Sequence, residues 1–248
     1  MVRQYEIWQS KGQERMRATE FLIERWTPET VKSYFDKKKQ REIAKRDIKV
    51  SQPILDCVLL KYQTVPDLAR SFFRLAEYYE GSRNGNNKQV TLVDFLDQWV
   101  DRKGNVDYFK FWDGFNITDQ AFRSWLKSAG PLSAAEQVTV DTIQQATKHM
   151  KKFCIIGVGS NDTDTLKHEL FHAKYYLDSD FKSAVDQLLT DHATDPAVRT
   201  IKKILINKLD YTNHVEEEIG AYLYAGSQLK LVFGVDPKDL VDLIQELD

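Results

Sequence analysis

The chain has 248 residues, 42% hydrophobic and 12% aromatic, which is enough to bury the core of one large domain. Its 35 lysines and arginines are nearly balanced by 37 aspartates and glutamates, giving a formal net charge of -2. This balance gives no electrostatic reason to expect nucleic acid or an acidic membrane as a partner. The N-terminus lacks the apolar core of a secretory signal and no uncharged stretch is long enough to cross a bilayer, so we expect a cytoplasmic protein.

The first half of the chain is predicted to be mostly helical. Thr91 and Thr118 have the position of N-caps, and Ser133 with Glu136 has the spacing of a capping box that opens a helix to about Lys148. The other predicted helices of this half span residues 13–25, 28–46, 66–80, 92–102 and 119–128.

Residues 82–88, with Gly85 between asparagines, predict a loop. The aromatic cluster that follows is interpreted as a strand or turn packed in the core, because only Lys110 lies among its rings and a stacking platform for nucleic-acid bases needs more positive charge. Its members are Tyr108, Phe109, Phe111, Trp112 and Phe115.

A break at Gly130 and Pro131 divides a helical N-terminal lobe, residues 1–130, from the remaining part, residues 131–248. We expect the two parts to form a single functional unit. Cys57 and Cys154 are too few for a disulfide framework and stand in apolar contexts, so buried free thiols are predicted.

Residues 153–158 form a short apolar run that predicts a strand. A polar loop follows, and then a helix with Asp162 or Asp164 as its cap. On a helix that turns about 100° per residue, one narrow stripe is apolar and forms the predicted core face. The stripe consists of Leu166, Leu170, Ala173 and Leu177.

The same helix carries the sequence His-Glu-Leu-Phe-His at residues 168–172, an H-E-x-x-H motif. His168 and His172 are four residues apart on a helix and point the same way, so their imidazoles can share one metal ion. Glu169 can reach a water molecule held by that metal, which is the position of a general base. The alternative is that the two histidines are packing residues or a surface pair without a ligand.

A catalytic zinc ion needs a third protein ligand and one open position for water. Beyond predicted helices at residues 181–192 and 195–209, a further helix is expected on which Tyr211, His214, Glu218 and Tyr222 share one face. Glu218 is therefore the predicted third ligand.

The two glutamates before Glu218 are assigned other roles. Glu216 is interpreted as the capping partner of Asn213, and Glu217 is expected to face solvent. The alternative is that the acidic triplet is only a favourable first turn at the positive end of a helix.

These motifs resemble the gluzincin branch of the zincin metallopeptidases, in which H-E-x-x-H and a distal helical glutamate hold zinc. The resemblance covers about residues 150–228. It implies that His168, His172 and Glu218 bind one zinc ion and that Glu169 is the general base and acid. Tyr222 departs from the thermolysin-like pattern, which has an aspartate at this position.

The resemblance also implies a fold: α+β and predominantly helical, with a zincin-like core, a short sheet and helical lobes. The strand at residues 153–158 would be the edge strand that pairs with an extended substrate.

The sequence thus predicts a metallopeptidase with one Zn²⁺ per chain that cleaves a peptide or protein substrate. His214, Tyr211 and Tyr222 are candidate donors to the tetrahedral intermediate. Two alternatives stay open: a zinc amidohydrolase acting on a non-peptide amide, and a non-catalytic interaction protein with a structural or regulatory zinc site. The sequence does not indicate an oligomeric state.

Overall fold

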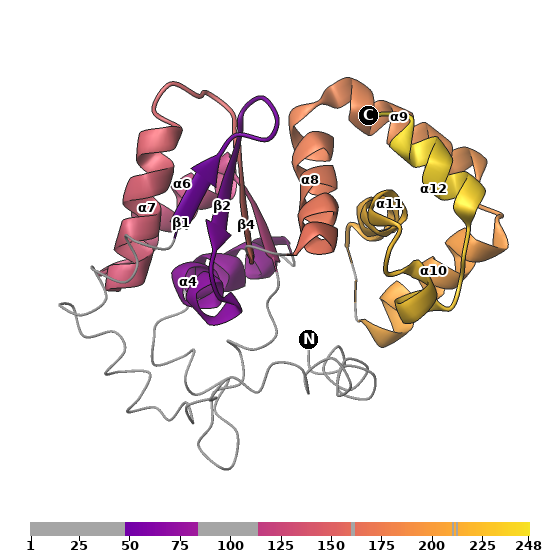
Figure 1. The fold of residues 1–248 in the computed structure, drawn as a ribbon, viewed down its shortest axis with the longest axis horizontal. Helices are drawn as coiled ribbons and strands as arrows, with labels where there is room; N and C mark the ends of the chain where they lie inside the picture. The colour runs from indigo at the N-terminus through magenta and orange to yellow at the C-terminus, as the bar shows by residue number, and fades with distance from the viewer. Residues whose placement is uncertain (1–47, 84–113, 160–161, 210, 212) are drawn as a thin grey trace, which may run out of the picture. The chain divides into compact units, whose positions relative to one another are not determined.

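A mixed sheet and the helices around it make up the first part of the described chain (Figure 1). The structure, a computed structural model, describes residues 48–83, 114–159, 162–209, 211 and 213–248. Within these, residues up to 177 belong to one compact unit and residues from 178 onward to a second, helical one. The expected α+β, mostly helical fold class is confirmed.

The sheet has four strands in the order β1-β2-β4-β3. They are β1 (Ile48–Ser51), β2 (Cys57–Tyr62), β3 (Gly114–Thr118) and β4 (Cys154–Gly159). Strand β4 runs parallel to β2 and antiparallel to β3, while β1 is antiparallel to β2.

The expected strand at residues 153–158 is present as β4, but its predicted place at the sheet edge is wrong. All six residues of β4 are buried and the strand pairs on both sides. Its continuous apolar run is typical of a strand covered on both faces, but coverage of the faces does not determine whether a strand lies at the edge of its sheet. Among the described strands, β3 is the edge next to β4.

The pairing of β4 also bears on the division expected at Gly130 and Pro131. Because β4 comes after that point in the chain and inserts between β2 and β3, the point falls inside the first compact unit.

Three helices pack on one face of the sheet: α4 (Val65–Arg83), α6 (Asp119–Ser128) and α7 (Ala134–Ala146). Phe72 of α4 stacks on Phe115 of β3 with ring centroids 5.3 Å apart. The core between these helices and the sheet also includes Val58, Leu60, Ile117, Trp125, Ile143 and Ile155.

Local signals place these helices well. Thr118 accepts a hydrogen bond from the backbone of Ala121, and both bonds of the predicted Ser133–Glu136 capping box are present. Helix α4 extends to Arg83, so the start of the predicted loop at residues 82–88 is helical. The predictions that lie outside the described residues are the helices at 13–25, 28–46 and 92–102, residues 84–88, and the rings of Tyr108, Phe109, Phe111 and Trp112.

A buried ion pair joins α4 to α7. The Nε and Nη2 atoms of Arg74 each donate to one carboxylate oxygen of Glu136 at 2.7 Å, and Arg74 also donates to the carbonyls of Ala129 and Pro131 at 3.0 Å. Both side chains are less than a tenth exposed. The guanidinium is thus satisfied by four acceptor contacts, which a buried charge requires.

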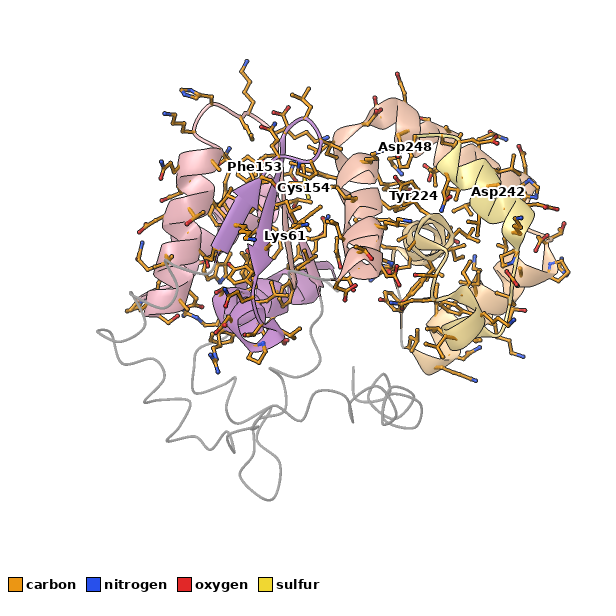
Figure 2. The ribbon with its side chains drawn as sticks, viewed as in Figure 1. Lys61, Phe153, Cys154, Tyr224, Asp242 and Asp248 are labelled. Carbon is orange, nitrogen blue, oxygen red and sulfur yellow. The ribbon has the colours of Figure 1, made fainter. Side chains whose placement is uncertain are left out.

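Helix α8 (Thr163–Leu177) covers the opposite face of the sheet. Its predicted apolar stripe is confirmed, because Leu166, Leu170, Ala173 and Leu177 all pack against β2 and β4. Their partners in this second core are Cys57, Leu59, Cys154, Ile156 and Val158. Both cysteines are free and buried, as expected. Figure 2 labels Phe153 and Cys154 where β4 begins.

The second unit consists of α9 (Ser179–Asp191), α10 (Pro196–Lys208), α11 (Val215–Ala225), the π-helical turn η2 (Leu229–Phe233) and α12 (Lys238–Gln245). Helices α9 and α10 match the predictions to within two residues. Helix α11 is joined to the end of the chain, since Tyr224 donates from its hydroxyl to Asp248 at 2.7 Å (Figure 2). No helix among the described residues combines the length and apolar character that a membrane span requires.

Gly157 provides a test of this packing. A Cβ at Gly157 would come within 2.8 Å of Leu68 and 2.9 Å of Phe72, whereas one at Gly159 would meet Val65 at 3.8 Å, an ordinary contact. We expect Gly157→Ala to lower the free energy of unfolding by about 1–3 kcal/mol, the usual cost of overpacking a core. Gly159→Ala, in the same strand, is the matched control and should unfold near the wild-type urea midpoint. Equal midpoints for the two variants would contradict the close approach of α4 to β4.

Candidate metal centre

Contacts at both ends hold α8 in place. The Asp162 carboxylate caps the helix by accepting hydrogen bonds from the backbone nitrogen and the hydroxyl of Thr165, at 2.9 and 2.7 Å. Of the two predicted caps, Asp162 therefore fills the role. Near the other end, the Tyr176 hydroxyl donates to Asp119 of α6 at 2.7 Å, and burial together with this bond raises the pKa of the Tyr176 phenol. With its apolar stripe packed against β2 and β4, the helix is held against rotation about its axis.

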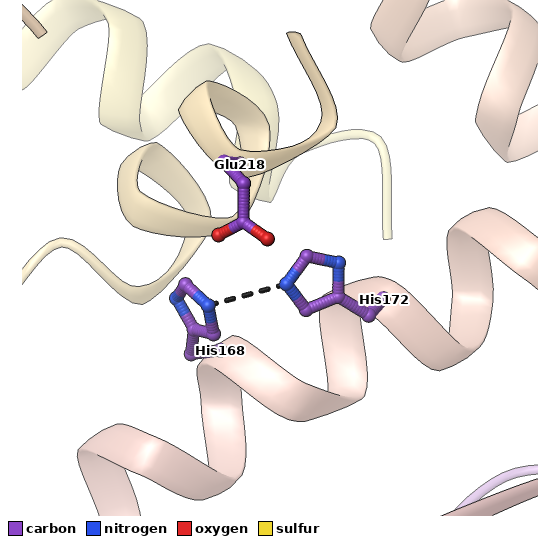
Figure 3. Close-up of side chains that lie close together, drawn as sticks. All are labelled: His168, His172 and Glu218. Atoms are coloured by element: carbon purple, nitrogen blue, oxygen red, sulfur yellow. Dashed lines mark hydrogen bonds between the residues drawn. The ribbon is translucent and has the colours of Figure 1, made fainter. Parts of the chain in front are cut away.

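The two histidines of the motif meet on the arc of α8 beside this stripe. The Nε2 atoms of His168 and His172 are 3.2 Å apart and their ring centroids 4.9 Å apart (Figure 3). Two Zn–N bonds of normal length at a tetrahedral angle would separate the nitrogens by about 3.3–3.4 Å. The pair therefore has the spacing of two ligands of one metal ion. A hydrogen bond between the rings has a similar length.

Glu169 lies next to the edge strand. A Cβ built on Gly114, the first residue of β3, would be 2.9 Å from Oε1 of Glu169 and 3.1 Å from its Cγ. The backbone carbonyl of Glu169 also accepts a hydrogen bond from Nδ2 of Asn116 at 2.7 Å. The predicted base thus contacts β3 through both its side chain and its backbone.

Glu218 is buried in the first turn of α11, with 4% of the residue exposed. Each of His168, His172 and Glu218 offers one potential ligand atom, and these three atoms lie within 4.8 Å of one another (Figure 3). A buried carboxylate is costly unless a cation or hydrogen-bond donors compensate its charge. Glu218 therefore has the burial and the chemistry of a ligand, and its role as the third ligand stays a prediction.

The start of α11 differs from the prediction. The helix begins at Val215, and its N-cap is His214, which has the left-handed φ of 57° and makes no side-chain capping bond. Asn213 is therefore not the N-cap that was expected to pair with Glu216. Glu216 instead accepts a hydrogen bond from Lys202 at 2.6 Å, which holds the pKa of Glu216 below its ordinary value.

Glu217 does not simply face solvent, as was expected. Its side chain is 17% exposed and one of its carboxylate oxygens lies 3.3 Å from Nδ1 of His214. His214 and Glu217 are three residues apart, so their side chains lie side by side on the first turn of the helix.

The helical face predicted to unite Tyr211, His214, Glu218 and Tyr222 is not formed as a whole. Tyr211 precedes α11 and its backbone nitrogen donates to Leu205. His214 is half exposed, and Tyr222 packs its ring edge-on against Phe233 at 4.8 Å. The role of Tyr211, His214 and Tyr222 at the oxyanion stays a prediction.

Two residues that the sequence reasoning passed over, Gly114 and Asn116, contact Glu169. They are 53 or more positions away in the chain, and no local motif marks them. Only the pairing of β3 with β4 next to α8 brings them to the motif. Phe115, which lies between them, is predicted from the sequence only as an aromatic residue of the core.

Comparisons of the chain with protein-family models, curated proteins and solved structures found no match. The chemistry of the centre must therefore follow from its own residues.

The three glutamates of α11 should differ sharply in their effect on metal binding. We expect Glu218→Ala to weaken zinc affinity by more than about 100-fold, beyond what losing an outer partner of a ligand usually costs. Glu216→Ala and Glu217→Ala are matched controls in adjacent positions and should stay near wild type. Competition with a chromogenic chelator measures all three affinities, and circular dichroism verifies the fold. If Glu217→Ala were the variant that emptied the site, the assignment of Glu218 would be wrong.

Proposed function

We propose that this chain is a zinc-dependent metallohydrolase that cleaves peptide bonds. His168, His172 and Glu218 are the metal ligands, and Glu169 is the general base. The observation that carries the proposal is the 3.2 Å separation of the two Nε2 atoms, with a buried carboxylate inside the same 4.8 Å cluster. Two imidazoles and one carboxylate form a donor set suited to zinc in a hydrolytic site.

The number of ligands supports a catalytic rather than a structural centre. Structural zinc sites are closed by four protein ligands, whereas catalytic sites keep a position open for water or substrate. Within the described part of the chain, the cluster offers three ligands. A structural site would also have no use for a carboxylate beside the first histidine, where Glu169 stands.

When bound, zinc supplies Lewis acidity that makes a water molecule more acidic and polarises the scissile carbonyl. Glu169 accepts the proton from the attacking water and afterwards delivers it to the nitrogen of the leaving amine. His214, Tyr211 and Tyr222 remain the proposed donors to the oxygen that becomes negatively charged.

Strand β3, and not residues 153–158, is the strand that we propose pairs with an extended substrate. An extended peptide can add to a sheet edge through main-chain hydrogen bonds. Because β3 is the edge next to β4 among the described strands and its Gly114 lies close to Glu169, a peptide aligned on β3 would pass close to the base. This arrangement favours an extended peptide over a small amide as substrate.

Purified protein is expected to carry about one zinc ion per chain, since the cluster provides three ligands for a single metal. The measurement is metal analysis by mass spectrometry on protein never exposed to nickel resin, after zinc addition and dialysis. A zinc content well below half an equivalent would rule out the centre.

Glu169→Gln should separate catalysis from metal binding. The amide cannot accept a proton from water, so we expect the hydrolytic rate to fall by about 10²–10⁴-fold, the usual contribution of a general base. Zinc content and thermal stability should remain near wild type, because Glu169 is not a ligand. His168→Ala is the contrasting variant and should lose the metal itself.

The assay is cleavage of a fluorogenic peptide library. Equal cleavage by wild type and Glu169→Gln would place the activity elsewhere in the sample. A zinc-loaded wild type that cleaves no peptide but hydrolyses small amides would support the amidohydrolase alternative. Stable zinc without any hydrolysis would support the non-catalytic one.

A further inference from the structure

We propose that β3 positions the general base, with Gly114 leaving the space that the Glu169 carboxylate occupies and Asn116 holding the Glu169 backbone. The catalytic part of this proposal rests on the proposed function. Gly114 and Asn116 are two residues apart, so they lie on the same side of the strand. Phe115 and Ile117, on the other side, are buried in the core with α4.

The space at Gly114 is too small for a side chain. A Cβ there would lie 2.5 Å from Cγ2 of Thr165 and 2.9 Å from Oε1 of Glu169. Thr165 is β-branched and its hydroxyl is bound to Asp162, so it has little freedom to move. The carboxylate of Glu169 is the flexible end of its side chain and would be the group that gives way. Glycine at this position is therefore what allows the carboxylate its observed place.

Asn116 fixes the backbone of the same residue. Its Nδ2 donates to the carbonyl of Glu169 at 2.7 Å, and its Oδ1 accepts from Sγ of Cys154 at 3.0 Å. The thiol therefore orients the amide, and the amide ties the middle of α8 to the edge strand. The bond from Asn116 to the Glu169 carbonyl is additional to the backbone hydrogen bonds of the helix. It lies near the two histidines in the middle of α8 and not at either end.

These two contacts give β3 a role distinct from binding metal. Neither Gly114 nor Asn116 belongs to the ligand cluster, and both act on Glu169. The position of a general base relative to the attacking water governs the rate, because proton transfer requires hydrogen-bond reach. Gly114 and Asn116 are therefore positioning residues for Glu169.

The first test is structural and needs no activity. Crystal structures of metal-free wild type and Gly114→Ala are compared at Glu169. We expect the carboxylate in the variant to leave its wild-type position until it reaches an ordinary contact distance from the new methyl group. Gly159→Ala is the control and should leave Glu169 in place. An unmoved Glu169 carboxylate in Gly114→Ala would overturn the proposal, whether or not the protein hydrolyses peptides.

The clash with Thr165 could destabilise the variant by itself. Thr165→Ser removes the Cγ2 atom and retains the hydroxyl that bonds to Asp162. The double variant Gly114→Ala/Thr165→Ser should therefore recover stability while the Glu169 carboxylate stays displaced. A double variant in which Glu169 returns to its wild-type place would show that Thr165 alone responds to residue 114, against the proposal.

The second test is kinetic. We expect Gly114→Ala/Thr165→Ser to lower kcat by about 100-fold, the cost associated with a misplacement of the order of 1 Å. KM and zinc affinity should change by less than about threefold, because the added methyl group lies on the side of Glu169, and the main-chain groups of β3 that would pair with a peptide and the metal ligands keep their chemistry. Thr165→Ser alone should keep the wild-type kcat. For Asn116→Ala we expect a smaller loss of kcat, with zinc retained.

A double-mutant cycle with Glu169→Gln distinguishes positioning from a general structural effect. If Gly114 acts through the base, its substitution should cost little further rate once Glu169 is replaced by glutamine. An equal fold-loss in both backgrounds would overturn the positioning role. If wild type proves inactive or free of zinc, the proposed function fails, and the crystallographic comparison still decides whether β3 places Glu169.

Discussion

The burial of β4 on both faces is the constraint from which the rest of the first unit follows. A strand that is apolar on every side must be covered twice, and here α4 and α8 cover it from opposite faces. The apolar stripe of α8 fixes the rotation of that helix about its axis. This rotation determines which residues lie on the arc next to the core face. His168 and His172 occupy that remaining arc. The packing of the sheet thus orients the candidate metal ligands before any metal binds.

Orientation of this kind matters for a hydrolytic centre because its groups must be in place when charge develops. The two imidazoles come from successive turns of one helix, so their spacing depends on helix geometry rather than on a loop. Glu169 is restrained from the strand side as well. The proposed ligands and the proposed base on α8 therefore have separate supports. The core stripe supports the two histidines, and β3 supports Glu169.

The parts of the fold that could be predicted from the sequence are those encoded by neighbours in the chain. The Ser133–Glu136 capping box, the Thr118 cap and the stripe from Leu166 to Leu177 all depend on residues a few positions apart. The H-E-x-x-H motif is likewise local. The edge position of β3 depends on pairing between distant segments, and no pattern within residues 153–158 distinguishes an interior strand that neighbours an edge from the edge itself.

The start of α11 was missed for a different reason. Asn213 is the better capping residue by preference, yet the helix begins after His214, which has a left-handed backbone that few residues other than glycine adopt. A Lys202–Glu216 bond from α10 and a His214–Glu217 contact accompany the later start. The observed start of α11 thus coincides with one contact to α10 and one within its own first turn, although the local capping preference favours Asn213. The face shared by Glu218 and Tyr222 survives this shift because both lie within the helix.

The buried pair of Arg74 and Glu136 restricts which substitutions this fold can accept during evolution. Glu136 serves twice, as the acceptor for Arg74 and as the second half of a capping box. Loss of either charge alone would leave the other uncompensated in a dry interior, at a cost of about 3–5 kcal/mol. Replacing both residues together by apolar ones of matching volume avoids the uncompensated charge, and the remaining cost is the loss of the capping bond to Ser133 and of the donors to the Ala129 and Pro131 carbonyls. Related sequences should therefore keep both residues or have neither, and this covariation would identify distant relatives when overall identity has faded.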